Sequence, residues 1–260
     1  MLFTVHNIAS HESINIDLEK DLILFLFQVC ARVHVHHSIV SSQILQSYGT
    51  LPWGRIVIAE HGPYLSNADQ KYLHNLLLLF GLVQGDRYVV VPGQIRKYKN
   101  MDLLKFFIER IIDNYKDVSI ILAGQFHPEL SEKDKGYFKK RNVRLSPVRL
   151  NDEQYNLLIK NALFVFLSYS EISTSGAMFH AISNKSLVLA PRLGTIPAYI
   201  DDKVTGYLYS NESIGSLYKG IDVLYSMATG NERSLIDKKF EQACNRLSWH
   251  YLQSKLFQFS

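Results

Sequence analysis

The second half of this sequence alternates short apolar runs with amphipathic segments, and this alternation most constrains how the chain folds. Short runs rich in Val, Ile and Leu are typical of buried strands, and the segments between them have the apolar spacing of helices. Such alternation predicts an α/β fold with a Rossmann-like parallel sheet and helices on both faces. We expect strands at 88–91, 118–123, 143–146, 163–167, 187–190 and 206–209, and helices at 101–115, 152–161, 177–183 and 214–227.

The first part of the chain also mixes strands and helices, but its alternation is less complete. Gly81 opens a short polar stretch, 81–86, that is typical of a linker into the second half. We expect strands at 3–5, 34–36 and 55–59, and helices at 18–33, 41–47 and 68–79.

Composition and charge exclude several classes of protein. The 28 basic and 24 acidic residues give a net charge of +4, which suits an anionic ligand or a lipid surface but not a dedicated nucleic-acid binder. Cys30 and Cys244 are isolated, as in proteins of a reducing cytoplasm, and neither has the ligand spacing of a zinc site. The apolar run 22–31 is too short to span a bilayer.

A basic loop lies between the expected strand 88–91 and the expected helix 101–115. It reads Pro-Gly-Gln-Ile-Arg-Lys-Tyr-Lys-Asn and contains Gly93, Arg96 and Lys99. Ligands of parallel α/β sheets bind beyond the carboxyl ends of the strands, where this loop lies. Arg96 can grip phosphate oxygens with two hydrogen bonds, and Lys99 can add a point charge. The alternative is a solvated surface loop, which we expect for Lys97.

A second loop of the same kind precedes the expected helix 177–183. Thr174, Ser175 and Gly176 offer hydroxyl groups, backbone N–H groups and a residue without a side chain at the start of that helix. Free N–H groups and the helix dipole favour an anion there, so phosphate is the expected ligand. The alternative is an ordinary helix cap, with Gly needed for packing. If both loops face one crevice, they form a diphosphate site.

Five motifs in order carry a resemblance to a known family: TVHN at 4–7, EHGPY at 60–64, GQIRKYKN at 93–100, ILAG at 121–124 and TSGAMFHAISNKSLVLAPRLGTIP at 174–197. Together they resemble the bacterial family-four-like glycosyltransferases of the GT-B architecture, in the subgroup that bears TSGA or TSGS. The resemblance implies transfer of a sugar from a nucleotide diphosphate sugar to a saccharide or lipid-linked acceptor, as in surface polysaccharide synthesis. It implies no further cofactor and often no metal.

The family's domain organisation can be carried over to this chain. It implies a partial acceptor-side α/β domain at 1–80, a donor-binding Rossmann-like domain at 81–231, and a helical segment at 232–260 that returns to the first domain. Relatives have further strands before the TVHN motif. The alternatives are a truncated reading frame, a second chain that supplies those strands, or a reduced variant of the domain.

The resemblance also implies site residues on the acceptor side of the cleft. His6 matches the family's TxHN position near the donor sugar, and His11 and Glu12 follow in a loop that can touch the acceptor. A histidine bonded to nearby backbone is the alternative for His6. His61 matches the family's HG turn, which either closes over the cleft or simply turns the chain.

One acidic pattern of the family is incomplete here. Glu171 matches the first carboxylate of a Glu-x7-Glu pattern, which meets the donor sugar, but Phe179 stands where relatives have the acid that holds the ribose. Either the next residue, His180, is the polar partner, or this helix only packs. The following loop contains Arg192, Gly194 and Thr195, which contact the nucleotide or sugar or form a plain turn.

The residues and the resemblance together predict a metal-independent glycosyltransferase. Retention of anomeric configuration is favoured and inversion is the alternative. The expected location is the cytoplasm, at the inner face of the membrane, with peripheral membrane contact. Two other functions stay open: a noncatalytic or partner-dependent subunit that binds nucleotide sugars, and a GT-B sugar-nucleotide epimerase. Fold alone does not decide among them.

Overall fold

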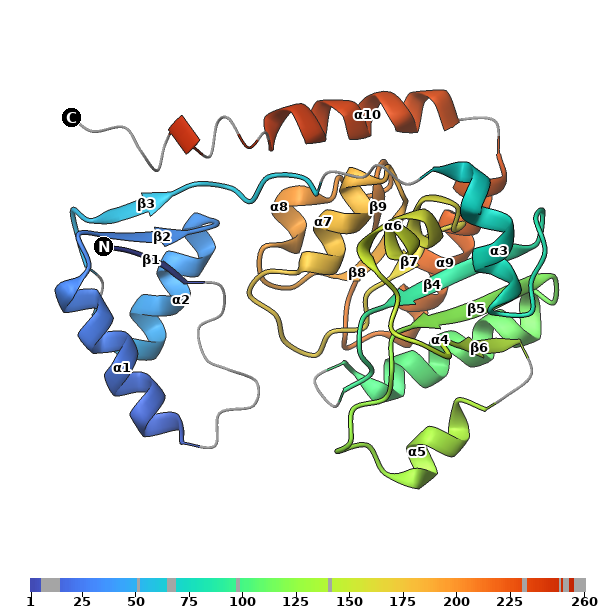
Figure 1. Cartoon of the computed structure of the whole chain (residues 1–260), viewed down its shortest axis with the longest axis horizontal. Coiled ribbons are helices and arrows are strands. Elements are labelled where there is room, and N and C mark those ends of the chain that lie inside the picture. The colour runs from blue at the N-terminus through green and yellow to red at the C-terminus, as the bar shows by residue number, and fades with distance from the viewer. Residues whose placement is uncertain are drawn as a thin grey trace.

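The chain forms a small and a large α/β unit, each around its own parallel sheet (Figure 1). The structure is a computed structural model that describes residues 1–5, 15–50, 52–64, 69–96, 99–139, 142–230, 233–247, 249 and 253–254. The predicted fold class is therefore confirmed: both sheets are parallel and helices pack against them. In Figure 1 the small unit occupies the left of the molecule and the large unit the right.

The small unit has a three-stranded sheet in the order β1-β2-β3. Its core contains Val5, Val33 and Val35 from the sheet, and Ile23 and Phe27 from the first helix. Its elements are β1 (Leu2–Val5), α1 (Ile16–Val29), β2 (Arg32–Val35), α2 (Ser38–Tyr48) and β3 (Ile56–Ile58).

The expected helix 18–33 is wrong at its carboxyl end. The helix α1 ends at Val29, and Cys30 takes an extended conformation as its cap. Arg55 closes this end by donating hydrogen bonds to the carbonyl oxygens of Phe27 at 2.6 Å and Cys30 at 2.8 Å. Val33 then pairs with strands on both sides, so tertiary pairing overrides an apolar run that continues through the turn.

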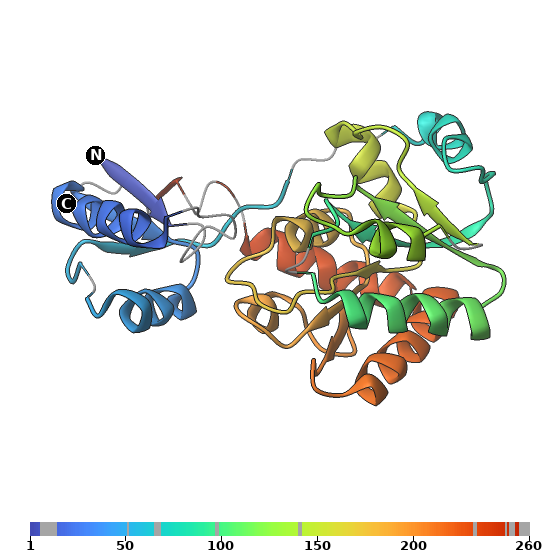
Figure 2. The same ribbon diagram turned by 90° about the horizontal axis from the view of Figure 1, so that it is seen from below.

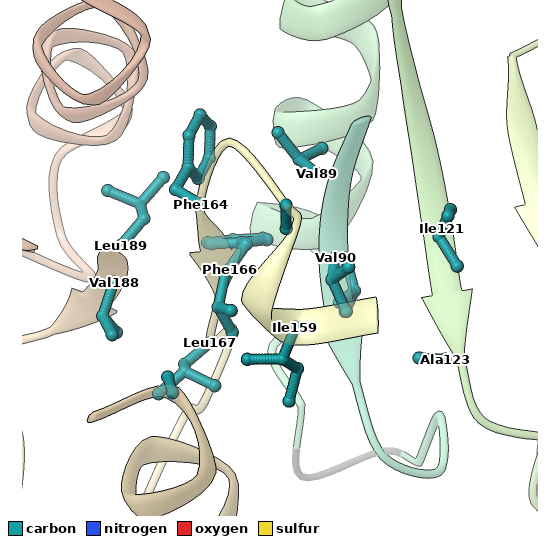
Figure 3. Packing of buried hydrophobic residues seen from close by; sticks show 14 of the residues in the cluster. Val89, Val90, Ile121, Ala123, Ile159, Phe164, Phe166, Leu167, Val188 and Leu189 are labelled. Atoms are coloured by element: carbon teal, nitrogen blue, oxygen red, sulfur yellow. The ribbon is translucent and has the colours of Figure 1, made fainter. Parts of the chain in front are cut away.

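The large unit has a six-stranded sheet in the order β6-β5-β4-β7-β8-β9. All the expected strands and helices of this half are found, two of the strands with the expected bounds, and only the ends of the others shift by up to two residues. Its strands are β4 (Arg87–Pro92), β5 (Val118–Ala123), β6 (Val143–Leu145), β7 (Val165–Phe166), β8 (Val188–Pro191) and β9 (Gly206–Tyr209). Figure 3 shows the apolar side chains of the central strands packed in its interior.

Helices cover both faces of the large sheet (Figure 2). The chain runs from β4 outward through β5 to β6, then returns to β7 and continues in the opposite direction to β9. Crossovers between parallel strands are right-handed as a rule, so a reversal of this kind puts helices on opposite faces. Thus α4 packs against α9, while α6 and α10 pack against α7. The helices are η1 (Gln70–Tyr72), α3 (Leu73–Leu78), α4 (Met101–Asn114), α5 (Glu132–Tyr137), α6 (Asp152–Lys160), α7 (Gly176–Ser183), α8 (Ile196–Tyr199), α9 (Ile214–Thr229) and α10 (Arg233–Arg246).

The helix that precedes the expected boundary at residue 80 packs with the large unit, and the boundary itself stays a prediction. Leu73, Leu76 and Leu77 of α3, with Phe80 after it, belong to the core of the large unit, and α3 packs against α6. The small unit's core stops at the sheet that ends with β3. The connection between the units therefore includes the segment 59–64, which lies before α3.

The close contact between the ends of β4 and β5 generates a stability prediction. A Cβ on Gly124 would lie 2.4 Å from the carbonyl oxygen of Gly93, so Gly124→Ala must push two loops apart. We expect a loss of about 1–3 kcal/mol of unfolding free energy in urea denaturation. Gly136→Ala is the matched control, because it lies in α5 with open space around it and should be neutral or slightly stabilising. Equal stability of the two variants would contradict this packing.

Candidate functional site

The two loops singled out in the sequence follow neighbouring strands of the large sheet. Val90 of β4 pairs with Val165 of β7, although the two residues lie far apart in the chain. This is the point where the strand order reverses, and such a point opens a crevice beyond the carboxyl ends of the strands. Lys99 forms an isolated antiparallel bridge with Tyr169, so the loop after β4 touches the loop after β7 directly.

The loop after β4 is held by its own lysine. Lys99 is only 3% exposed, and its ammonium group donates to the carbonyl oxygens of Pro92 and, at 3.1 Å, Gly93. Burial, with the nearby charge of Arg96, lowers the pKa of Lys99 to about 7. Arg96 donates to the side-chain oxygen of Gln94 from Nε at 2.8 Å. Two cationic side chains thus converge at one strand end.

The loop after β7 begins a helix with a buried serine. Ser175 caps α7 by accepting from the backbone N–H of Met178 at 3.1 Å, and its hydroxyl lies 2.9 Å from the Tyr169 hydroxyl. The capping alternative is therefore correct for this side chain. The N–H groups of Gly176 and Ala177 have no partner within the helix, because they lie in its first turn. Those two groups are free to meet an anion.

Two adjoining cavities lie over these loops, with volumes of about 620 and 290 Å³. They share Gly93 from the first loop, Gly176 and Ala177 from the second, and Tyr155 from α6. The smaller cavity adds Lys99, Thr174 and Ser175; the larger adds Arg96 and the groups Tyr64, Gln94, Ala123, Gly124, Gln125, Arg149, Leu150, Asp152 and His180. The structure therefore brings the cationic loop and the hydroxyl-rich loop together around one space.

His180 lines the larger cavity in a defined tautomer. The side-chain oxygen of Asn156 lies 2.8 Å from His180 Nδ1 and also accepts from Asn184 at 2.8 Å. Nδ1 must therefore carry the proton, which leaves Nε2 as an acceptor. Burial lowers the pKa of His180 to about 4, so the ring is neutral. Phe179, where relatives have the second acid, is buried in the core.

Other residues expected at the site lie outside both cavities. Glu171 is exposed and lines neither of them. Arg192 pairs with Asp202 at 2.9 Å. Gly194 and Thr195 support the loop after β7: a Cβ on Gly194 would lie 2.1 Å from a carbonyl oxygen of that loop, and the Thr195 N–H donates to the Ser173 carbonyl at 3.0 Å. Contacts of Glu171, Arg192, Gly194 and Thr195 with a donor stay predictions.

The expected acceptor-side residues are only partly described. His6, His11 and Glu12 lie outside the described residues. His61 stacks on Phe179, with ring centroids 4.7 Å apart, and its ring lies 5.4 Å from that of His36. It therefore joins the small unit to α7 and does not line either cavity. The described part of the chain holds no group of three or more His, Cys, Asp or Glu side chains suited to a metal ion.

Sequence reasoning missed several residues of the larger cavity, above all Tyr64. Its ring lies 3.9 Å from that of His180 and only 9° from parallel. The EHGPY motif contained this tyrosine, but only the fold shows that it reaches the end of β4 and the start of α7. Arg149 and Leu150 follow β6, and their position beyond a strand end was the available signal for them.

Comparisons with known proteins agree with this geometry. The family model described as glycosyl transferases group 1 matches residues 86–227, more than half of the chain. The chain therefore belongs to that family. No curated protein matches the sequence.

Solved structures resemble both units together. A glycosyltransferase from Rickettsia africae ESF-5 matches 99% of this chain and 71% of its own with a TM-score of 0.75 and 14% identity. HepE from Anabaena with UDP and glucose matches 98% of this chain and 69% of its own, with a TM-score of 0.71 and 14% identity. TarM from S. aureus matches 98% of this chain and 49% of its own, with a TM-score of 0.70 and 16% identity. At these identities the likeness shows the GT-B fold.

Proposed function

We propose that this chain transfers a sugar from a nucleotide diphosphate sugar to a saccharide or lipid-linked acceptor of surface polysaccharide synthesis. The observation that carries the proposal is the meeting of Arg96 and Lys99 with the first turn of α7 around one space at the switch point of the sheet. Two of the matched structures support the donor class, because HepE was solved with UDP and glucose and TarM with UDP, fondaparinux and α-GlcNAc-glycerol.

The proposed chemistry is stabilisation of the leaving group. The bond between the anomeric carbon and the β-phosphate oxygen breaks, and its electron pair leaves with the nucleoside diphosphate. The acceptor oxygen forms the new bond, and its proton passes to the departing phosphate or to solvent. Arg96, the Lys99 ammonium and the N–H groups of Gly176 and Ala177 would meet the charge that grows on the diphosphate. These groups supply positive charge, which supports a reaction that needs neither a metal nor a further cofactor.

The nucleoside belongs in the larger cavity under this proposal. His180 lies one helical turn beyond Gly176, so its acceptor nitrogen is within reach of a ribose attached to a phosphate at the helix start. This assigns to His180 the hydroxyl contact that relatives make with the second acid. For Glu171 and His6 the resemblance still implies a role at the donor sugar, with retention favoured over inversion.

The proposal includes partners beyond the nucleotide sugar. The outer face of α1 exposes Leu18, Leu22, Phe25 and Val29 at the spacing of a helix–helix seam, with exposed fractions of 65, 54, 55 and 47%. These exposed apolar side chains support the proposal that further polypeptide, such as a second chain, packs on α1 and completes the acceptor side. A cytoplasmic location with peripheral membrane contact fits the net charge of +4. No described helix is long and apolar enough to cross a bilayer.

The first test removes the cationic side chains one at a time. Arg96→Ala and Lys99→Ala should each weaken binding of UDP, or of whichever nucleoside diphosphate the wild type prefers, about tenfold or more in calorimetry, because each loses a charged hydrogen bond to phosphate. Lys116→Ala, which removes an exposed lysine on the edge of the same unit, is the control for net charge. Unchanged affinity in both site variants would contradict the proposed binding of the diphosphate by Arg96 and Lys99.

The second test separates the three candidate functions. The protein is incubated with a panel of nucleotide sugars, with and without a lipid-linked saccharide, and the products are followed by chromatography. Acceptor-dependent release of nucleoside diphosphate is the expected result, and the anomeric configuration of the product then distinguishes retention from inversion. Interconversion of sugars would instead identify an epimerase, and saturable binding without turnover would identify a binding subunit.

A further inference from the structure

Tyr64 reaches the nucleotide cavity from outside the region that the family model matches. Its ring lies flat on that of His180, and its hydroxyl oxygen lies 3.4 Å from the position that a Cβ on Gly176 would occupy. The segment that joins the two units therefore delivers a phenol to the first turn of α7, where the proposed function expects the diphosphate.

The Tyr64 hydroxyl has no hydrogen-bond partner among the described residues, although the backbone of this tyrosine is bonded. Its N–H donates to the side-chain oxygen of Ser183 at 2.8 Å, which fixes the residue against α7. Burial raises the pKa of the Tyr64 hydroxyl, so the group keeps its proton and remains a donor. A protonated hydroxyl beside the N–H groups of a first helical turn is suited to an anion.

Trp249 clamps the peptide that precedes Tyr64. Its indole N–H donates to the Pro63 carbonyl at 2.6 Å, and its ring packs on Gly62 so closely that a Cβ there would lie 2.5 Å from it. The His61 ring stacks on Phe179 of α7, and its centroid lies 5.1 Å from that of the Trp249 ring. The segment 61–64 is therefore fixed between α7 and a side chain that follows α10 in the chain.

We propose that the Tyr64 hydroxyl donates a hydrogen bond to the diphosphate of the nucleotide sugar, and that Trp249 is the residue that positions Tyr64 for this contact. The inference rests on the proposed function and adds two residues to it. Under this proposal, three parts of the chain form the donor site: the two strand-end loops, the connection between the units, and the C-terminal segment.

The first experiment uses calorimetry to measure how the wild type and Tyr64→Phe bind UDP and uridine. If the wild type prefers another base, the nucleoside diphosphate and the nucleoside of that base are used instead. Tyr64→Phe keeps the ring and its stacking on His180 and loses only the hydroxyl. We expect about a tenfold loss of affinity for the diphosphate and no change for the nucleoside, because the lost bond is to a charged group. Tyr72→Phe, an exposed tyrosine on η1, is the control and should change neither affinity.

The second experiment tests the positioning role with Trp249→Phe, Trp249→Ala and each combined with Tyr64→Phe. Trp249→Phe keeps an aromatic ring on Gly62 and loses the bond to Pro63, so it should still fold. We expect Trp249→Phe and Trp249→Ala each to weaken diphosphate binding. Adding Tyr64→Phe to either of them should lower the affinity little further, since the effects of coupled residues are not additive. Fully additive losses would overturn the positioning role of Trp249.

The outcomes also separate this inference from the proposed function. If the wild type binds no nucleoside diphosphate, the proposed function fails and the inference fails with it. If the wild type binds the diphosphate and Tyr64→Phe binds it equally well, only the inference is overturned. An equal loss for the nucleoside would likewise overturn it, because that result assigns Tyr64 to the base or the ribose.

Discussion

The pairing of β4 with β7 is the constraint on which the rest of the site depends. The two strands are separated in the chain by two other strands and three helices, yet the reversal of strand order makes them neighbours. Their loops therefore open at the same edge of the sheet, one with Arg96 and Lys99 and the other with the first turn of α7. Buried lysine bonds and a capping serine hold each loop in place before any ligand arrives, which is the preorganisation that electrostatic stabilisation requires.

The sequence predicted the large unit well because its strands are short, apolar and separated by amphipathic helices. It failed at α1, where an apolar run continues past the end of the helix and hydrophobicity cannot distinguish a buried helix from the strand that follows. The leucines of α3 show a related limit, because they indicate a helix but do not tell which core receives it.

Only the parts of the candidate site that directly follow strands could be predicted from the sequence. Both loops could be named because each follows an apolar run, but Tyr64 and the bond from Asn156 to His180 depend on contacts between distant segments. Arg192 shows the reverse case, since its strand-end position suggested a ligand while its nearest partner is Asp202. The family model covers the sheet and both loops but not Tyr64, so part of the cavity wall comes from the segment that joins the two units.

A crystal structure of the protein with a bound nucleoside diphosphate tests the central claim most directly. The account predicts that the two phosphates lie between the loops, within hydrogen-bonding distance of the Gly176 or Ala177 N–H groups on one side and of Arg96 or Lys99 on the other. Phosphates that are well ordered elsewhere, or that contact only one of the loops while the other points away, would contradict it.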